Sequence, residues 1–70
     1  MKPKPNPPPI GPRIRAARVV AGLTQQVVAQ AVGITQGYLS YMECGRRSPS
    51  LAALKRLAKA LGVTAGSLVD

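Results

Sequence analysis

Residues 36–44, with the sequence QGYLSYMEC, carry hydrogen-bonding side chains at a spacing that suits contact with a nucleic acid. In an α-helix, at about 100° per residue, one arc of about 140° holds Gln36, Gly37, Ser40, Tyr41 and Cys44. The arc carries no charge, and glutamine is a bidentate partner for adenine in the major groove. It therefore favours a helix that reads base edges, although a polar face that only meets solvent has the same composition.

The residues before this arc indicate how it is held. Residues 25–44 predict two short helices joined by a tight turn at Gly33. Ala29 is a small residue in the first helix, which lets the second helix cross closely, and Leu39 and Met42 occupy the inner face of the second. This spacing is typical of a helix-turn-helix, which places its second helix in the major groove of DNA. The preceding helix and turn therefore favour a DNA-reading face over a merely solvated one.

The predicted start of the second helix suits a phosphate group. Thr35 is placed as its N-cap, directly before Gln36. Backbone N–H groups and the helix dipole at such an end favour negative charge. We therefore expect Thr35 to lie at a DNA phosphate.

The charge balance of the chain indicates a polyanionic partner. Ten Lys and Arg residues stand against two acids, Glu43 and Asp70, which gives a net charge of +8. Double-stranded DNA and an anionic membrane surface both fit this charge. The uncharged polar arc argues against the membrane, because helices that lie on membranes need a large apolar face.

The residue types that most catalytic and metal sites need are scarce in the sequence. There is no histidine, Cys44 is the single cysteine, and the two acids cannot form a general acid/base pair. We therefore expect no enzymatic activity, no metal and no cofactor. A single thiol fits a reducing compartment, and no apolar run approaches the ~18 residues of a membrane-spanning helix, which favours a cytoplasmic protein associated with the nucleoid through DNA. We interpret Cys44 as an ordinary surface position rather than a redox switch.

Proline, glycine and hydroxyl residues divide the chain into an arm and one domain. Residues 1–10 are rich in proline and predict a disordered basic arm, in which Lys2 and Lys4 are either solvated or in contact with DNA. Residues 11–70 predict an all-α domain with helices at about 12–21, 25–32, 36–44, 51–61 and 65–69. The expected N-caps are Thr24, Thr35, Ser50 and Thr64, and the expected helix-ending glycines are Gly22, Gly33, Gly45 and Gly62.

Helical spacing assigns a face to the apolar residues of each helix. The expected inner positions are Ile14, Ala17, Ala21, Val28, Ala29, Val32, Leu39, Met42, Leu51, Leu54, Leu57, Ala58 and Leu61, with Ile34 buried in the turn and Val63 and Leu68 closing the bottom of the core. The expected outward positions are Ala16, Val19, Val20, Val27 and Ala31, and the cations Lys55, Arg56 and Lys59. The outward aliphatic residues are either a protein-partner surface or ordinary exposed side chains.

Residues 10–69 resemble the lambda-repressor-like, Cro/C1-type (XRE family) helix-turn-helix domain. The resemblance is carried by Leu23-Thr24-Gln25, Ala29, Gly33-Ile34-Thr35, Tyr38-Leu39-Ser40, Glu43, Gly45, Arg47, Pro49-Ser50 and the run LAKALGV at 57–63. It implies a five-helix lambda-repressor-like fold that binds operator DNA, usually as a dimer on a palindromic site.

The resemblance also implies roles for particular residues. The residues that it places toward the major groove are Gln36, Gly37, Ser40 and Tyr41, with Gln36 as the lead base reader. It places Gln25, Arg46 and Arg47 at backbone phosphates. Gly37 departs from the family pattern, because a side chain commonly reads a base at this position. We therefore expect fewer direct contacts between side chains and bases here.

Arg18 and Glu43 are expected to form a largely buried ion pair. Helical phase places Arg18 on the inner face of helix 12–21, and Glu43 next to the inner face of helix 36–44. The family resemblance pairs the same two positions. The pair would tie the first helix to the DNA-reading helix; two separate solvated charges are the alternative.

These features make a sequence-specific DNA-binding transcriptional regulator, of repressor type, the leading hypothesis. An antitoxin that binds both DNA and a toxin through the outward valines is the alternative. We expect the protein to form a weak homodimer that a palindromic operator reinforces. The resemblance places the contact around helix 65–69 and the chain end, with the outward valines as the rival surface.

Overall fold

The computed structural model describes residues 10–69, and within this range every regular element is an α-helix. The helices are α1 (Ile10–Val20), α2 (Gln25–Val32), α3 (Gln36–Glu43), α4 (Leu51–Leu61) and α5 (Ala65–Val69). The predicted all-α fold with five helices is therefore confirmed for this part of the chain.

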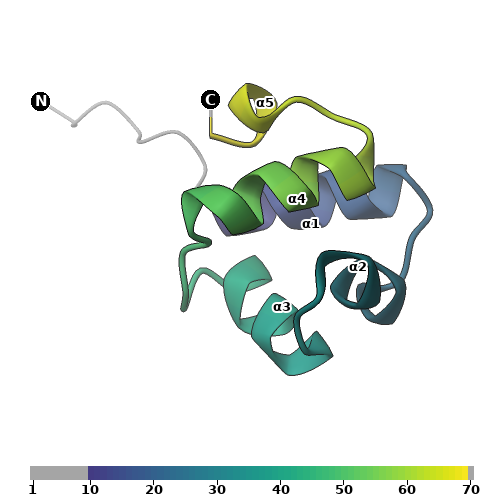
Figure 1. Ribbon diagram of the computed structural model, residues 1–70, viewed down its shortest axis with the longest axis vertical. Helices are drawn as coiled ribbons and strands as arrows, with labels where there is room; N and C mark the ends of the chain where they lie inside the picture. The colour runs from purple at the N-terminus through teal and green to yellow at the C-terminus, as the bar shows by residue number, and fades with distance from the viewer. Residues whose placement is uncertain (1–9, 70) are drawn as a thin grey trace, which may run out of the picture.

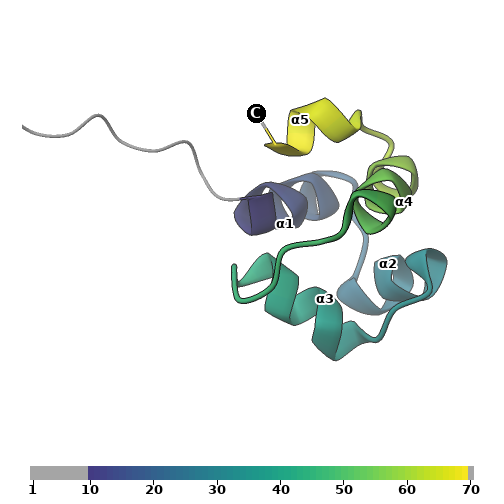
Figure 2. The same ribbon diagram turned by 60° about the vertical axis from the view of Figure 1, so that its left-hand side comes forward.

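The helices are arranged on three levels. The two longest helices, α1 and α4, lie side by side in the middle, with α2 and α3 on one side of them and α5 on the other (Figures 1 and 2). α3 packs against α1 and α2, while α2 also packs against α4. This arrangement leaves the far side of α3 uncovered by the rest of the domain.

The predicted caps fix where the helices begin and end. The side-chain oxygens of Thr24, Thr35, Ser50 and Thr64 each accept a hydrogen bond from a backbone N–H three residues later, at 3.1–3.2 Å. These bonds satisfy donors that have no acceptor inside the helix. The four predicted helix-ending glycines all have positive φ.

A single core joins the helices. Its buried apolar residues are Ile14, Val28, Ala29, Val32, Leu39, Met42, Leu54, Leu57, Ala58, Leu61 and Leu68, all of which were predicted to face inward. Ala17 and Ile34 pack against this core while remaining partly exposed.

Three predicted core positions are wrong. Ala21 is exposed, and it lies one residue beyond Val20, the last residue of α1. Leu51 is 67% exposed because it is the first residue of α4, and helical side chains lean toward the N-terminus, here beyond the packed part of the helix. Val63 is 36% exposed in the connection after α4, whereas Leu68, which was predicted to close the core with it, is buried.

The first helix begins two residues earlier than predicted, at Ile10. Proline is compatible with a first helical turn, whose N–H groups lack acceptors inside the helix, so Pro12 does not have to be the first helical residue. Ile10, which the prediction placed in the arm, packs against the core. The rest of the predicted arm, residues 1–9, lies outside the described residues.

Gly11 marks a close crossing between α1 and the end of α3. It is buried, and a Cβ atom at this position would collide with the backbone carbonyl oxygen of Met42. The same atom would lie 3.1 Å from the carbonyl oxygen of Glu43 and from the nitrogen of Gly45. The two chain segments can approach this closely only because residue 11 has no side chain.

Candidate nucleic-acid interface

The turn between α2 and α3 is held by backbone hydrogen bonds. Gly33 ends α2 with φ 81°, a left-handed conformation that glycine adopts without strain. The N–H groups of Gly33 and Ile34 both donate to the carbonyl oxygen of Ala29, at 2.9 and 3.0 Å. The Thr35 cap then starts α3 two residues after the glycine. These bonds fix the direction in which α3 leaves α2.

The inner side of this helix pair anchors it to the core. Leu39 and Met42 of α3 are fully buried, and Ala29 of α2 is 2% exposed. The small Ala29 side chain allows the contact between α2 and α3 that its position predicted. The orientation of the outer side of α3 is therefore set by rigid packing.

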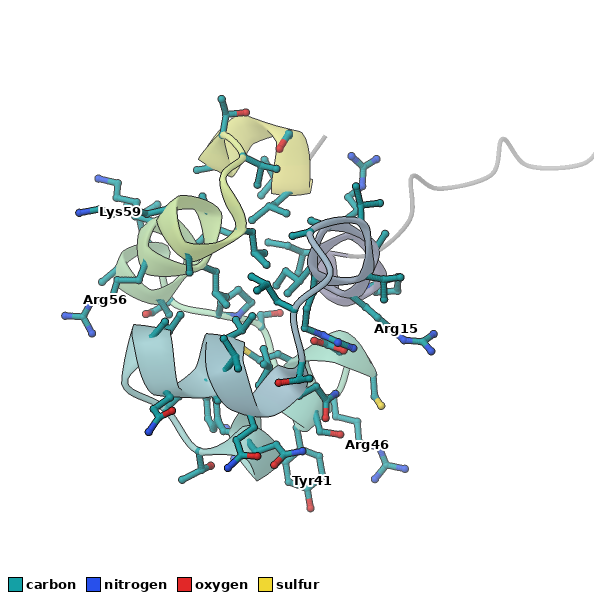
Figure 3. The ribbon with its side chains drawn as sticks, turned by 90° about the vertical axis from the view of Figure 1, so that its right-hand side faces the viewer. Arg15, Tyr41, Arg46, Arg56 and Lys59 are labelled. Atoms are coloured by element: carbon teal, nitrogen blue, oxygen red, sulfur yellow. The ribbon has the colours of Figure 1, made fainter. Side chains whose placement is uncertain are left out.

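The outer side of α3 faces solvent as the helical phase predicted. Gln36, Gly37, Tyr41 and Cys44 are exposed, and Ser40 is partly buried. Tyr41 projects away from the body of the domain (Figure 3), with 54% of its surface accessible. The exposed arc presents amide and hydroxyl groups, which can donate and accept hydrogen bonds at base edges.

A hollow between α2 and the start of α3 places further amides beside Gln36. Gln26 and Gln30 line it together with Gln36. Their spacing of four residues puts Gln26 and Gln30 on one face of α2. Sequence reasoning did not single out these two residues, although this spacing was the available signal.

Thr35 is the residue at the exposed N-terminal end of α3. Its Oγ1 accepts the capping hydrogen bond from the Tyr38 N–H at 3.1 Å. A hydroxyl has one donor hydrogen in addition to its lone pairs, so the cap leaves Thr35 able to donate to a phosphate oxygen.

Arg46 and Arg47 lie in the connection after α3, and both are exposed. The backbone of this connection is held to the helix, because the N–H of Arg46 donates to the carbonyl oxygen of Tyr41 at 2.9 Å. The side chain of Arg46 extends outward near the α3 side of the domain (Figure 3). This connection places positive charge next to the exposed arc.

The predicted ion pair between Arg18 and Glu43 is present. Arg18 Nε donates to Glu43 Oε2 at 2.7 Å, and a second guanidinium nitrogen donates to Oε1 at 3.0 Å. The side chains are 13% and 2% exposed. The hydrogen bond with Glu43 raises the pKa of Arg18 above its ordinary value; the negative charge of Glu43 adds to this rise, and burial opposes it. Arg18 also donates to the carbonyl oxygen of Leu23 at 2.9 Å.

Gln25 joins this pair, which the sequence did not predict. Its Nε2 donates to Glu43 Oε1 at 3.1 Å. The carboxylate of Glu43, at the end of α3, is therefore bonded to α1 and to the start of α2. With one amide hydrogen directed at Glu43, Gln25 keeps two donors for the predicted phosphate contact: the second hydrogen of the same nitrogen and its backbone N–H at the start of α2.

Neither metal-binding clusters nor membrane-spanning helices occur among residues 10–69. No group of three or more His, Cys, Asp or Glu side chains comes together there. No helix in the same range is long and apolar enough to cross a membrane.

Comparison with known proteins identifies the arrangement of α2, turn and α3. A family model described as a helix-turn-helix domain matches residues 9–70. The chain belongs to this helix-turn-helix family. The predicted resemblance is confirmed at the level of the family, and it covers the whole described part of the chain.

Individual members of the family are similar over most of this chain. An uncharacterized HTH-type transcriptional regulator, y4dJ from Sinorhizobium fredii, is 43% identical over 60 residues, which cover 86% of this chain and 78% of the relative. The immunity repressor protein of Bacillus phage phi105 is 37% identical over 60 residues, which are 86% of this chain but 42% of that repressor.

A solved structure supports the fold independently. The crystal structure of SinR, a master regulator for biofilm formation, in complex with DNA has a TM-score of 0.81 and 31% identity to this helix-turn-helix chain. The match covers 87% of this chain and 98% of that one. The five-helix lambda-repressor-like fold predicted from the sequence is therefore shown.

Proposed function

We propose that this helix-turn-helix protein is a sequence-specific DNA-binding transcriptional regulator that acts as a repressor. The observation that carries the proposal is the exposed, uncharged arc of α3, which a rigid helix pair presents beside exposed arginines. Relatives that are named transcriptional regulators or repressors, and a similar structure that contains DNA, support the same function.

In this proposal α3 enters the major groove and reads base edges. Gln36 is the lead reader because its exposed amide lies at the start of the helix, where it can form two hydrogen bonds with adenine. The other groove-facing residues are Gly37, Ser40 and Tyr41. Gly37 contributes backbone only, so the readout rests on few side chains.

Phosphate contacts hold the protein in register on the duplex without reading sequence. The residues proposed for this role are Gln25, Thr35, Arg46 and Arg47. They lie at the starts of α2 and α3 and in the connection after α3, so they flank the exposed arc on the chain. The two arginines carry the charge that phosphate neutralisation requires.

The proposed DNA-bound form is a weak dimer on a palindromic operator. α5 and the chain end are the proposed contact, and Val69 there is 46% exposed. Leu68, which was predicted to share in the contact, is 1% exposed and packs inside its own domain. The contact therefore rests on Val69 and on the surface of residues 64–67.

The outward valines supply the rival surface. Val19, Val20 and Val27 are 60%, 88% and 49% exposed, as their phases predicted. Scattered exposed aliphatic side chains do not identify a partner on their own. The relatives described above are named regulators and repressors, so the antitoxin alternative receives no support from them.

Selection from a pool of random DNA duplexes tests the proposed function. The full chain is incubated with the pool, bound duplexes are recovered, and their sequences are compared with the starting pool. We expect enrichment of an inverted repeat whose half-sites lie about 34 Å apart, one turn of DNA. A recovered pool with the same sequence distribution as the input would contradict sequence-specific binding.

A further inference from the structure

Arg15 lies on the side of α1 that meets the end of α3. Gly11, four residues before it, packs against the carbonyl oxygen of Met42, and Arg18, three residues after it, binds Glu43. Residues three and four apart share a helix face, so Arg15 belongs to the same side of α1. Arg15 and Glu43 also line one groove. Unlike its two neighbours on this face, Arg15 is exposed.

Arg15 and Arg46 extend to the same side of the molecule from two different elements. Figure 3 shows both side chains on the right-hand side of the view, Arg15 from α1 and Arg46 from the connection after α3. Arg56 and Lys59, which belong to α4, extend to the opposite side in the same view. Two exposed cations therefore stand beside the C-terminal end of the helix that carries the reading arc.

The described part of the chain has one carboxylate near these two cations, and its hydrogen bonds go to other residues. Glu43 is the single acid among residues 10–69. Its oxygens accept hydrogen bonds from Arg18 and Gln25, and its side chain is 2% exposed. An external anion beside two exposed cations is attracted to both of them and offsets their mutual repulsion. The arrangement fits an external anion at this end of α3.

We propose that Arg15 contacts a phosphate of the bound DNA, so that the phosphate-binding surface continues from the connection after α3 onto α1. The proposal rests on the proposed DNA-binding function and adds a contact that neither the family motifs nor the sequence analysis assigned. The guanidinium group suits this role because its fork of donors matches phosphate oxygens in a bidentate manner. Arg15 reads no base, because it projects from α1 and not from the outer arc of α3.

Salt dependence of DNA affinity, compared between two matched variants, tests the proposal. Arg15→Gln and Arg56→Gln each remove one exposed helical arginine and lower the net charge equally, but from opposite sides of the domain. The probes are a labelled duplex of mixed sequence and the duplex enriched in the selection. For Arg15→Gln we expect the slope of log K against log salt to become shallower by about 0.9, the value for one phosphate. Arg56→Gln keeps the wild-type slope.

The slope change has a direct consequence for affinity. When salt rises from 50 mM to 200 mM, the factor by which affinity falls should be about threefold smaller for Arg15→Gln than for the wild type, because the variant makes one phosphate contact fewer. The loss at low salt should be equal on the two duplexes, because a phosphate contact carries no sequence information. Arg15→Lys, which keeps the charge, should restore the wild-type slope while binding more weakly than arginine.

Other results overturn the proposal. Equal slopes for Arg15→Gln and the wild type would show that Arg15 makes no phosphate contact. Equal changes in both glutamine variants would show a general effect of net charge. If Arg15→Lys does not restore the wild-type slope, the slope change comes from altered local structure and not from a lost phosphate contact. If the wild type itself binds neither duplex, the proposed function fails, which is distinct from failure at Arg15 alone.

Discussion

At the scale of single residues, the buried side chain of Glu43 connects the end of α3 to two other helices. One buried carboxylate accepts hydrogen bonds from α1 and from the start of α2, and it stands at the last residue of α3. An acid without partners at this site would leave a buried charge uncompensated. Arg18 and Gln25 therefore help to hold α3, which carries the proposed reading residues, together with the buried packing of Leu39 and Met42.

Breaking the Arg18–Glu43 pair should destabilise the fold. Arg18→Ala and Glu43→Ala should each lower the free energy of unfolding by about 3–5 kcal/mol, because each leaves a largely buried charge without the opposite charge that compensates it. The double variant should lose less than the sum, as measured by denaturant unfolding. Arg56→Ala, at an exposed position on α4, is the control and should change little. Strict additivity would mean that the two groups do not interact.

The stability that Arg18 contributes through this pair should not change with pH near neutrality. The pKa of Arg18 is raised in the folded state, so its contribution is complete below the unfolded-state pKa and is lost only as pH rises through the folded-state value. Both values lie in the strongly alkaline range of arginine. Unfolding experiments on Arg18→Ala and the wild type should therefore give the same difference in stability at pH 7 and at pH 9, within error.

At the scale of elements, the starts of α2, α3 and α4 follow from capping residues that the sequence shows directly, whereas the start of α1 at Ile10 does not. Thr24, Thr35 and Ser50 mark where these helices begin, because each side-chain oxygen accepts a hydrogen bond from a backbone N–H in the first turn. Helical phase predicted burial correctly in the middle of each helix but failed at helix ends, as at Leu51. Phase gives the direction of a side chain, but it does not show whether another helix lies in that direction.

Some contacts need tertiary structure and could not be predicted from local sequence. In the sequence, Gly11 is simply the residue before Pro12. No neighbouring residue indicates that the end of α3 packs against Gly11. The same holds for the bond between Gln25 and Glu43, which are 18 residues apart. The Arg18–Glu43 pair was predictable because helical phase and the family resemblance agreed on it.

Two glycine substitutions test the close crossing at α1. Gly11→Ala should destabilise the domain by about 1–3 kcal/mol, because the added Cβ collides with backbone atoms that cannot move aside as a side chain can. Gly37→Ala is the matched control: a Cβ there meets nothing within 4 Å, and alanine should stabilise the exposed helix by up to about 1 kcal/mol. Thermal unfolding measures both. A Gly11→Ala variant as stable as the wild type would contradict the crossing.

At the scale of the whole molecule, positive charge and dimer formation govern how the domain meets DNA. The chain carries a net charge of +8, so two copies repel each other until DNA neutralises them. α5 has five residues and buries Leu68 in its own core, which leaves a small surface for a partner. We therefore expect association on DNA rather than a stable free dimer.

Charge substitutions at two exposed valines locate the dimer contact. Val69→Asp should reduce cooperative binding to the full inverted repeat and leave half-site binding unchanged, because a charge desolvated in the contact costs free energy. Val20→Asp, at a position that is 88% exposed on α1, should change neither. Binding titrations on full and half sites give the comparison. The reverse pattern would move the contact to α1.

The claim that α3 reads base edges is tested most directly by Gln36→Ala. Affinity is measured for the selected inverted repeat and for a duplex of mixed sequence, with Arg46→Ala as the contrasting variant. Gln36→Ala should lose about 1–3 kcal/mol of binding free energy on the inverted repeat, with relaxed preference at one position of each half-site, and much less on the mixed duplex. Arg46→Ala should weaken both duplexes equally. Equal losses on the two duplexes for Gln36→Ala would contradict base reading by α3.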